Sequence, residues 1–214
     1  KKGEFLGIIG PNGAGKTTLL SLINGLGKLV QGRVWVLGHS ISRGSLNGIR
    51  KRVGYVAQLQ NIDPRMPINV EEVVMVGRYG QLGLFRRPSS TDRAIVDSVI
   101  ELVGMTPLAK RPIGHLSGGE QQRVAIAAAL ANNSSVILAD EPTGELDSQT
   151  AKKIVDLLIT VSRTFEKTSI IVTHDPSVAR PCDRIMRIED GVIKASYTPV
   201  EFEEGPSFAA SYID

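Results

Sequence analysis

Short apolar runs that end in glycine-rich breaks mark the first part of the chain. Residues 5–9 form an apolar run that leads into a glycine-rich loop, and a helical pattern begins near Lys16. This order predicts a strand, a loop and a helix. Residues 32–37 and 53–57 are rich in valine and punctuated by glycine, which predicts two further strands.

The pattern becomes helical from residue 70 to about residue 132, where leucine, isoleucine and valine recur at three- and four-residue spacing between proline and glycine breaks. Residues 148–163 predict an amphipathic helix with Ser148 as its N-cap. The apolar runs on either side of this helix are typical of strands buried on both faces. The strands expected after residue 132 are 135–139, 169–172 and a hairpin of 184–188 with 191–195.

Strands that alternate with helices predict an α/β fold with a mainly parallel sheet, interrupted by a helical insertion. The 214 residues suffice for one sizeable domain. We expect residues 1–69 and 133–196 to form the core of this domain and residues 70–132 to form a helical subdomain. Residues 197–214 lack a clear pattern and are expected to form a C-terminal tail.

Composition narrows the class of protein without identifying it. An apolar share of 42% with 22% charged residues is ordinary for a globular chain, and a net charge of +3 is too small to predict a nucleic-acid partner. The longest apolar stretch, residues 124–131, is far shorter than the roughly 20 residues that cross a bilayer. Any work at a membrane is therefore expected to need a partner that spans it.

Residues 10–18 read Gly-Pro-Asn-Gly-Ala-Gly-Lys-Thr-Thr and fit the P-loop pattern. Glycines let the backbone wrap phosphate oxygens with N–H donors, and the helix that follows adds its positive dipole end. Lys16 is predicted to reach the β- and γ-phosphates, Thr17 to ligate magnesium and Thr18 to hold the α-phosphate. The expected nucleotide-binding residues are Gly10, Asn12, Gly13, Ala14, Gly15, Lys16, Thr17 and Thr18.

A second glycine-rich helix start, Leu-Ser-Gly-Gly-Glu-Gln-Gln-Arg at residues 116–123, resembles the signature motif of ABC ATPases. By its residue types, Ser117 with Gly118 and Gly119 forms a second anion cradle. The resemblance implies that two subunits pair head to tail, so that the signature of one closes over the ATP on the P-loop of the other. These three residues would then bind nucleotide in trans.

The remaining motifs of the family follow in order. Residues 136–141, Val-Ile-Leu-Ala-Asp-Glu, resemble a Walker B strand, which implies that Asp140 holds the magnesium and its water shell while Glu141 polarises the attacking water. By the same resemblance Gln58 contacts magnesium and water, Asp147 lies at the subunit boundary and binds in trans, and His174 contacts the γ-phosphate.

The resemblance covers nearly the whole chain and implies a P-loop NTPase of the ABC ATPase type, with a small antiparallel β part beside the parallel sheet. ATP and Mg²⁺ are the implied cofactors. A second cassette and a transmembrane permease are the implied partners, which places the protein in the cytoplasm on the inner face of the membrane.

The two halves of the chain resemble different branches of the family. Residues 76–88 and 111–114 look like cassettes of manganese, zinc or iron-chelate importers, whereas residues 138–148 and 174–180 look like lipoprotein-release and macrolide-export cassettes. We weight the first half more, because it contains the expected coupling surface, and interpret the chain as a transport ATPase, with metal-ion import ahead of export. A soluble ABC ATPase is the other alternative, although the span between Gln58 and Leu116 is too short for the coiled coil of repair ATPases.

The sequence departs from the family pattern at its beginning. Family members carry an aromatic residue upstream of the P-loop that stacks on adenine, but only nine residues precede Gly10, and Tyr55 and Tyr79 lie downstream. Either the N-terminus is truncated, as we expect, or the cassette is genuinely short. Nucleotide affinity is then expected to be weaker if nothing replaces that residue, since base stacking is worth roughly 1–3 kcal/mol.

Overall fold

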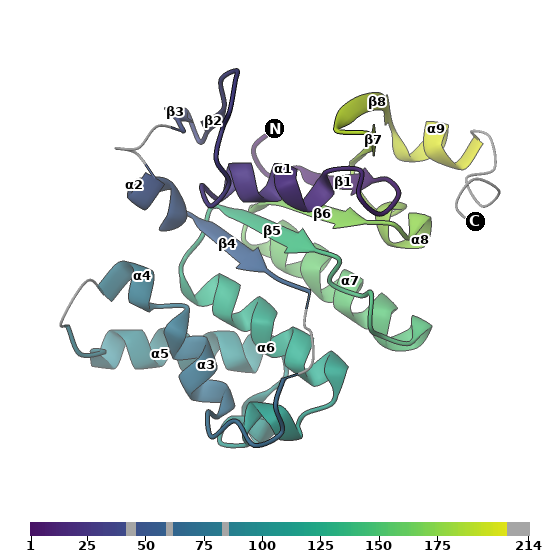
Figure 1. Ribbon diagram of the computed structural model, residues 1–214. Helices are drawn as coiled ribbons and strands as arrows, with labels where there is room; N and C mark the ends of the chain where they lie inside the picture. Colours follow the sequence, from purple (N-terminus) through teal and green to yellow (C-terminus); the bar gives the residue numbers. More distant parts are fainter. Residues whose placement is uncertain (42–45, 59–61, 83–85, 205–214) are drawn as a thin grey trace.

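The computed structural model describes residues 1–41, 46–58, 62–82 and 86–204. Its centre is a six-stranded sheet with the strand order β4-β5-β6-β1-β7-β8 (Figure 1). The first five of these strands are parallel, and β8 closes the edge antiparallel to β7. The strands are β1 (Phe5–Ile9), β4 (Val53–Val56), β5 (Val136–Asp140), β6 (Thr168–Thr173), β7 (Arg184–Glu189) and β8 (Val192–Tyr197).

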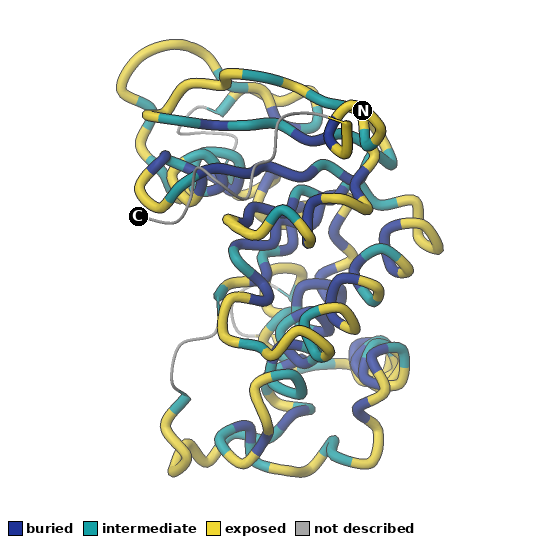
Figure 2. The backbone as a smooth tube through the Cα atoms, turned by 90° about the vertical axis from the view of Figure 1, so that its right-hand side faces the viewer, coloured by how far each residue is buried: buried dark blue, intermediate teal, exposed yellow. Residues whose placement is uncertain are grey.

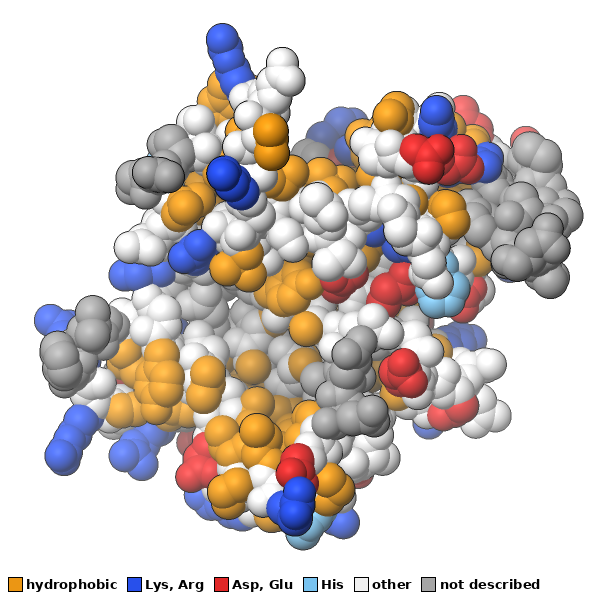
Figure 3. Space-filling model, in the orientation of Figure 1, with side chains coloured by type: hydrophobic (Ala, Val, Ile, Leu, Met, Phe, Trp, Pro, Cys, Tyr) orange, Lys and Arg blue, Asp and Glu red, His pale blue; other side chains and the backbone are white. Residues whose placement is uncertain are grey.

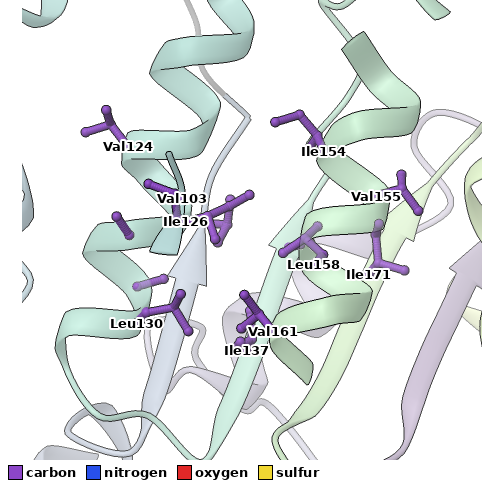
Figure 4. Packing of buried hydrophobic residues seen from close by; sticks show 14 of the residues in the cluster. Val103, Val124, Ile126, Leu130, Ile137, Ile154, Val155, Leu158, Val161 and Ile171 are labelled. Atoms are coloured by element: carbon purple, nitrogen blue, oxygen red, sulfur yellow. The ribbon is translucent and has the colours of Figure 1, made fainter. Parts of the chain in front are cut away.

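Helices cover both faces of this sheet (Figure 1). Helix α1 (Lys16–Ile23) packs on one face, whereas α6 (Gly118–Ala131) and α7 (Ser148–Thr164) pack on the other. Figure 4 shows side chains from α6 and α7 converging on β5 and β6. The predicted α/β fold with a mainly parallel sheet is confirmed.

Alternation along β5 decides which way its last residue points. Val136 and Leu138 belong to the core cluster that contains Leu20 of α1, whereas Ile137 and Ala139 belong to the cluster beneath α6 and α7. Successive side chains of a strand point to opposite faces. Asp140 therefore continues the row on the α1 side.

The helical insertion packs its apolar faces against α6. Figure 2 shows buried residues along the inner sides of these helices. Arg78 joins three elements, because its guanidinium bonds Asp92 at 2.7 Å and the Ala131 carbonyl at 2.9 Å. The remaining helices among the described residues are α2 (Leu46–Arg50), α3 (Val70–Val76), α4 (Tyr79–Leu82), α5 (Ser90–Leu102), α8 (Pro176–Ala179) and α9 (Pro199–Glu204), with 3₁₀ turns at Thr106–Leu108 and Ile113–His115.

Three local predictions need correction. The strand expected over residues 32–37 is only β2 (Trp35–Val36), because Leu37 and Gly38 both have positive φ and turn the chain into β3 (His39–Ser40). Part of the expected tail is ordered structure: β8 runs to Tyr197, and α9 follows with Phe202 buried. Residues 205–214 lie outside the described residues.

The N-cap of α7 is Asp147 rather than the expected Ser148. Its carboxylate accepts the N–H groups of Gln149 at 3.0 Å and Thr150 at 3.1 Å. Hydrogen bonds from Thr150 hold the pKa of Asp147 below its ordinary value. A carboxylate at this position also complements the positive end of the helix dipole, which a serine hydroxyl does less well.

No helix within the described ranges is both long enough and apolar enough to cross a membrane.

Candidate nucleotide-binding site

The loop between β1 and α1 ends in a helix start without a side-chain cap. Gly15, the N-cap residue, has φ of 93°, a left-handed conformation that glycine adopts without steric cost. The N-cap makes no side-chain hydrogen bond to the first turn of α1, and this turn contains no acidic residue. Its N–H groups and positive dipole end are therefore available to an anion such as phosphate.

The hairpin of β7 and β8 packs against this loop. A Cβ atom at Gly10 would lie 2.2 Å from the carbonyl oxygen of Ile188, so a side chain is excluded there. The N–H of Gly191, at the hairpin turn, donates to the Ala14 carbonyl at 3.0 Å. Sequence analysis missed both Ile188 and Gly191, since nothing in the sequence links a distant hairpin to the loop.

Lys16 is buried at the centre of the loop, with a side-chain exposure of 6%. Its Nζ donates to the carbonyls of Gly10 at 2.8 Å and Pro11 at 3.1 Å, and lies 3.4 Å from Glu141 Oε1. A buried ammonium needs such partners because burial removes its hydration. The predicted phosphate-binding cation and the predicted catalytic carboxylate thus lie next to each other.

Asp140 has a hydrogen-bond donor on each of its oxygens. The Thr17 hydroxyl donates to Oδ1 at 3.1 Å, and the Tyr55 hydroxyl donates to Oδ2 at 2.8 Å. A hydroxyl and a carboxylate are hard oxygen ligands of the kind that Mg²⁺ prefers. Within the described residues no cluster of three or more histidine, cysteine or acidic side chains could hold a metal by itself. This pair fits Mg²⁺, which takes one or two protein ligands together with phosphate and water.

Glu141 leaves β5 in a left-handed conformation with φ of 44°. Its N–H donates to the Val172 carbonyl at 3.0 Å, which continues the pairing with β6. Its Oε2 accepts the N–H of His174 at 3.3 Å and lies 3.0 Å from His174 Nδ1. This conformation costs a non-glycine residue roughly 1–2 kcal/mol, and such outliers gather at functional sites.

Gln58 and Glu141 line the same cavity of about 420 Å³. The cavity is also lined by Gly118 and Gln122 from the signature helix and by Gly144, which follows the Walker B segment. The amide nitrogen of Gln122 is buried there and has no hydrogen-bond partner among the described residues. The segments that follow β4 and β5 and the start of α6 therefore all line this cavity.

The signature residues form a closed helix start. Ser117 is the N-cap of α6, and its N–H and hydroxyl both donate to Glu120 Oε2 at 2.8 Å. These bonds hold the pKa of Glu120 below its ordinary value. A Cβ atom at Gly119 would lie 2.4 Å from the Thr150 side chain of α7, so Gly119 also serves packing.

The predicted site residues form two groups of contacts, and both groups contribute to the cavity that Glu141 and Gly118 line. Lys16, Thr17, Asp140, Glu141 and His174 are linked by the contacts above. Ser117, Gly118 and Gly119 begin α6, in the helical part of the molecule below the sheet in Figure 1. Thr18 is exposed on the first turn of α1. Tyr55 is a further site residue that the sequence did not predict, since it was weighed there only against a stacking role.

A model of the ABC transporter family matches residues 1–144 of this chain. The chain belongs to this family. It is therefore an ATP-binding cassette with the ATPase fold, as the motifs predicted.

The similarity to curated relatives extends over most of the cassette. The manganese transport system ATP-binding protein of Synechocystis is 37% identical over 201 residues, which are 94% of this chain and 76% of that protein. The zinc transport system ATP-binding protein of Treponema pallidum is 40% identical over 203 residues, covering 92% of this chain and 74% of its own length.

A solved structure agrees with the fold. The ATP-binding cassette MJ0796 of Methanocaldococcus jannaschii was captured as a dimer in a post-hydrolysis state bound to ADP and phosphate. It superimposes on this chain with a TM-score of 0.77 at 36% identity, covering 93% of this chain and 87% of that chain. The mainly parallel sheet and the helical insertion are thus those of an ABC cassette.

Proposed function

We propose that this cassette binds ATP with Mg²⁺ and hydrolyses it as the motor subunit of a membrane transporter. The observation that carries the proposal is that Lys16 lies 3.4 Å from Glu141 and that the adjacent residues Thr17 and Asp140 are hydrogen-bonded to each other. A cation for phosphate, an oxygen pair for a metal and a carboxylate for water are the parts that phosphoryl transfer needs.

Each residue of this group has a distinct task in the proposal. Lys16 exchanges the Gly10 and Pro11 carbonyls for the β- and γ-phosphate oxygens, and the first turn of α1 donates its N–H groups to the phosphates. Thr17 and Asp140 hold the metal, which when bound neutralises phosphate charge. Gln58, at the adjoining cavity, contacts this metal and the attacking water.

Glu141 and His174 act at the γ-phosphate end of the site. Glu141 Oε2 orients the attacking water and accepts its proton, and His174, now beside this oxygen, contacts the γ-phosphate. His174 has a side-chain exposure of 53%, so it can turn toward an incoming nucleotide. Glu141 is far less exposed, at 12%, and its electrostatic effect is correspondingly stronger.

A second cassette completes the site in this proposal. Ser117 and Gly118 are exposed at the start of α6, and Asp147 is exposed at the start of α7. These residues, with Gly119, face the nucleotide held by the partner's P-loop. The solved dimer of the archaeal relative supports this arrangement.

A membrane permease is the other proposed partner. An apolar pocket of about 560 Å³ lies between β4, α3 and α6 and is lined by residues such as Val53, Ile68, Val73, Val124 and Ala128. Figure 3 shows hydrophobic side chains gathered over the helical part beside it. Because apolar surface of this kind favours burial against a partner, we propose that the permease docks here, on the cytoplasmic side of the membrane.

We propose that residues 1–69 and 133–196 form the nucleotide-binding core, that residues 70–132 form the helical subdomain that contacts the permease, and that residues 197–214 form the tail. Residues 83–85 of the importer-like segment lie outside the described residues.

Manganese or zinc import is the proposed transport reaction, because the named relatives belong to manganese and zinc transport systems. Residues 138–148 and 174–180 favour an export cassette as the second candidate, since their sequences resemble that branch. Copurifying the cassette with its permease and measuring ATP hydrolysis in liposomes with Mn²⁺ or Zn²⁺ outside separates the two. Stimulation of ATP hydrolysis by either ion supports import. The absence of stimulation by both ions contradicts import.

The first experiment measures Mg²⁺-dependent ATP hydrolysis over a range of protein concentrations, beside the variant Glu141→Gln. Hydrolysis that climbs faster than linearly with concentration supports the paired site. The variant keeps the shape of the side chain but loses its charge, and removing a general base lowers rates by about 10²–10⁴. Unchanged hydrolysis in the variant would contradict the role of Glu141.

A further inference from the structure

Tyr55 holds the carboxylate that the proposed function assigns to the metal, although no family motif singles it out. Its hydroxyl lies 2.8 Å from Asp140 Oδ2, while Thr17 occupies Oδ1 at 3.1 Å. With one donor on each oxygen, rotation of the carboxylate about its last bond would break both hydrogen bonds. The plane of the carboxylate is thereby set.

Strand register explains why this tyrosine reaches Asp140. In the parallel pair of β4 and β5, Tyr55 lies beside Leu138 and two residues before the level of Asp140. Tyr55 also packs against the core cluster that contains Leu138 and Leu20, which places its ring on the α1 face of the sheet. Side chains at this diagonal spacing are within reach of a long aromatic residue.

The chemistry of the pair makes the tyrosine a donor. A phenol has an ordinary pKa of about 10 and is therefore protonated at neutral pH. The Tyr55 hydroxyl accordingly donates to Oδ2 at 2.8 Å. A phenol cannot compensate the charge of a carboxylate as an arginine would, so Asp140 remains available to a cation.

We propose that Tyr55 is a positioning residue that turns the Asp140 carboxylate so that Oδ1, on the Thr17 side, faces the metal. This rests on the proposed function, in which Thr17 and Asp140 hold Mg²⁺. The tyrosine touches neither nucleotide nor metal. Its effect on metal affinity passes through the orientation of one carboxylate, in the way that outer-shell partners orient metal ligands.

A purely structural role makes a different prediction. Asp140 is buried, and a buried carboxylate needs hydrogen-bond donors whether or not it binds a metal. If Tyr55 served only that need, its removal would lower the stability of the fold and leave metal affinity unchanged. Metal affinity, measured apart from stability and from turnover, decides between the two roles.

The test uses Tyr55→Phe in the full chain that also contains Glu141→Gln, so that bound ATP is not hydrolysed. Binding of Mn²⁺ to the complex with ATP is measured by electron paramagnetic resonance, and ATP affinity is measured separately in EDTA. Losing one hydrogen bond is expected to weaken Mn²⁺ binding about three- to tenfold. ATP affinity in EDTA is expected to stay within about twofold, because the hydroxyl that Tyr55→Phe removes bonds Asp140, which in this proposal acts on the metal.

Tyr79→Phe is the matched control, since Tyr79 is 55% exposed on α4. It is expected to change neither quantity. A second readout is the rise in melting temperature when Mg²⁺ is added to the ATP complex, which follows metal affinity by linkage. This rise should be smaller in Tyr55→Phe than in Tyr79→Phe.

Unchanged or tighter Mn²⁺ binding in Tyr55→Phe would overturn the inference. Asp140→Asn distinguishes this result from a failure of the proposed function. If Asp140→Asn weakens Mn²⁺ binding and Tyr55→Phe does not, only the role of Tyr55 is wrong. If Asp140→Asn also leaves Mn²⁺ binding unchanged, Asp140 is not a metal ligand and both proposals fail.

Discussion

Two helices of this cassette begin in glycine-rich segments, yet one start is open and the other is closed. The first turn of α1 has no side-chain cap and no acidic residue. The first turn of α6 has a complete capping box, in which Ser117 and Glu120 bond each other's backbone N–H groups. The positive end of the helix dipole is thus left without a side-chain partner in the first turn of α1, whereas at α6 it is bonded by Ser117 and Glu120.

The difference shows that a glycine-rich helix start does not by itself make an anion site. At α1 the first turn has neither a side-chain cap nor an acidic residue of its own, so an external phosphate is the natural partner of its N–H groups. At α6 the carboxylate of Glu120 already compensates the dipole end. An isolated chain should therefore bind nucleotide at its P-loop, and the start of α6 should contribute only when a second chain closes over it.

The largest expected effect is on ATP affinity, when Lys16 is removed from the uncapped start of α1. Lys16→Ala removes the charge-assisted bonds to phosphate, each worth about 1.5–3 kcal/mol, so ATP affinity should fall at least tenfold. Fluorescent-nucleotide titration of the isolated chain measures this. Lys153→Ala, on the exposed face of α7, is the matched control and should bind as the unsubstituted chain does. Equal affinities for the two variants would place the nucleotide elsewhere.

Gly119→Ala probes the packing of the closed start. Its new Cβ would lie 2.4 Å from a β-branched side chain, and overpacking of this kind costs about 1–3 kcal/mol, partly offset by the better helix propensity of alanine. Urea unfolding should show a lower midpoint, whereas ATP affinity of the isolated chain should stay the same. Gly118→Ala, with 3.2 Å to a flexible leucine, should be milder. A reversed order would contradict the packing argument.

Ser117→Ala removes the N-cap itself. Loss of such a cap costs about 0.5–2 kcal/mol of stability. ATP binding by the isolated chain should not change, while concentration-dependent hydrolysis should fall if the start of α6 closes over a partner's nucleotide. Chemical denaturation and the hydrolysis assay measure the two effects separately. Weaker ATP binding by the isolated variant would mean that α6 already acts within one chain.

The smallest effect concerns a third capped start, at α5. Hydrogen bonds from Ser89, followed by Arg78, lower the pKa of Asp92 to about 2 from an ordinary 3.8. A carboxyl group whose pKa is lowered by folding stabilises the fold at any pH above its ordinary pKa. This stabilisation is lost as the pH falls toward the pKa of the folded state. Between pH 4 and pH 2 the unsubstituted chain should therefore lose more stability than Asp92→Asn. Parallel acid unfolding curves for the two chains would contradict this.

Much of this molecule could be predicted because its signals are local. The alternating strands and helices and the P-loop at residues 10–18 were read from the sequence, and family membership is confirmed. The roles of Gln58, Asp147, Glu141 and His174 stay predictions, although the structure places His174 beside the Glu141 carboxylate. Boundaries were less predictable: a two-residue turn at Leu37 shortened one strand, and the N-cap moved to Asp147.

The sequence by itself determined which chemistry is present: one lysine that follows a glycine-rich loop, two adjacent carboxylates and two glycine-rich helix starts. Only the tertiary structure decided which of these groups meet. The register of β4 and β5 brings Tyr55 to Asp140, and the approach of β7 makes Gly10 obligatory. The reason is physical, because residue types and helix ends are set by neighbours along the chain, whereas contacts between strands distant in sequence depend on how the sheet is assembled.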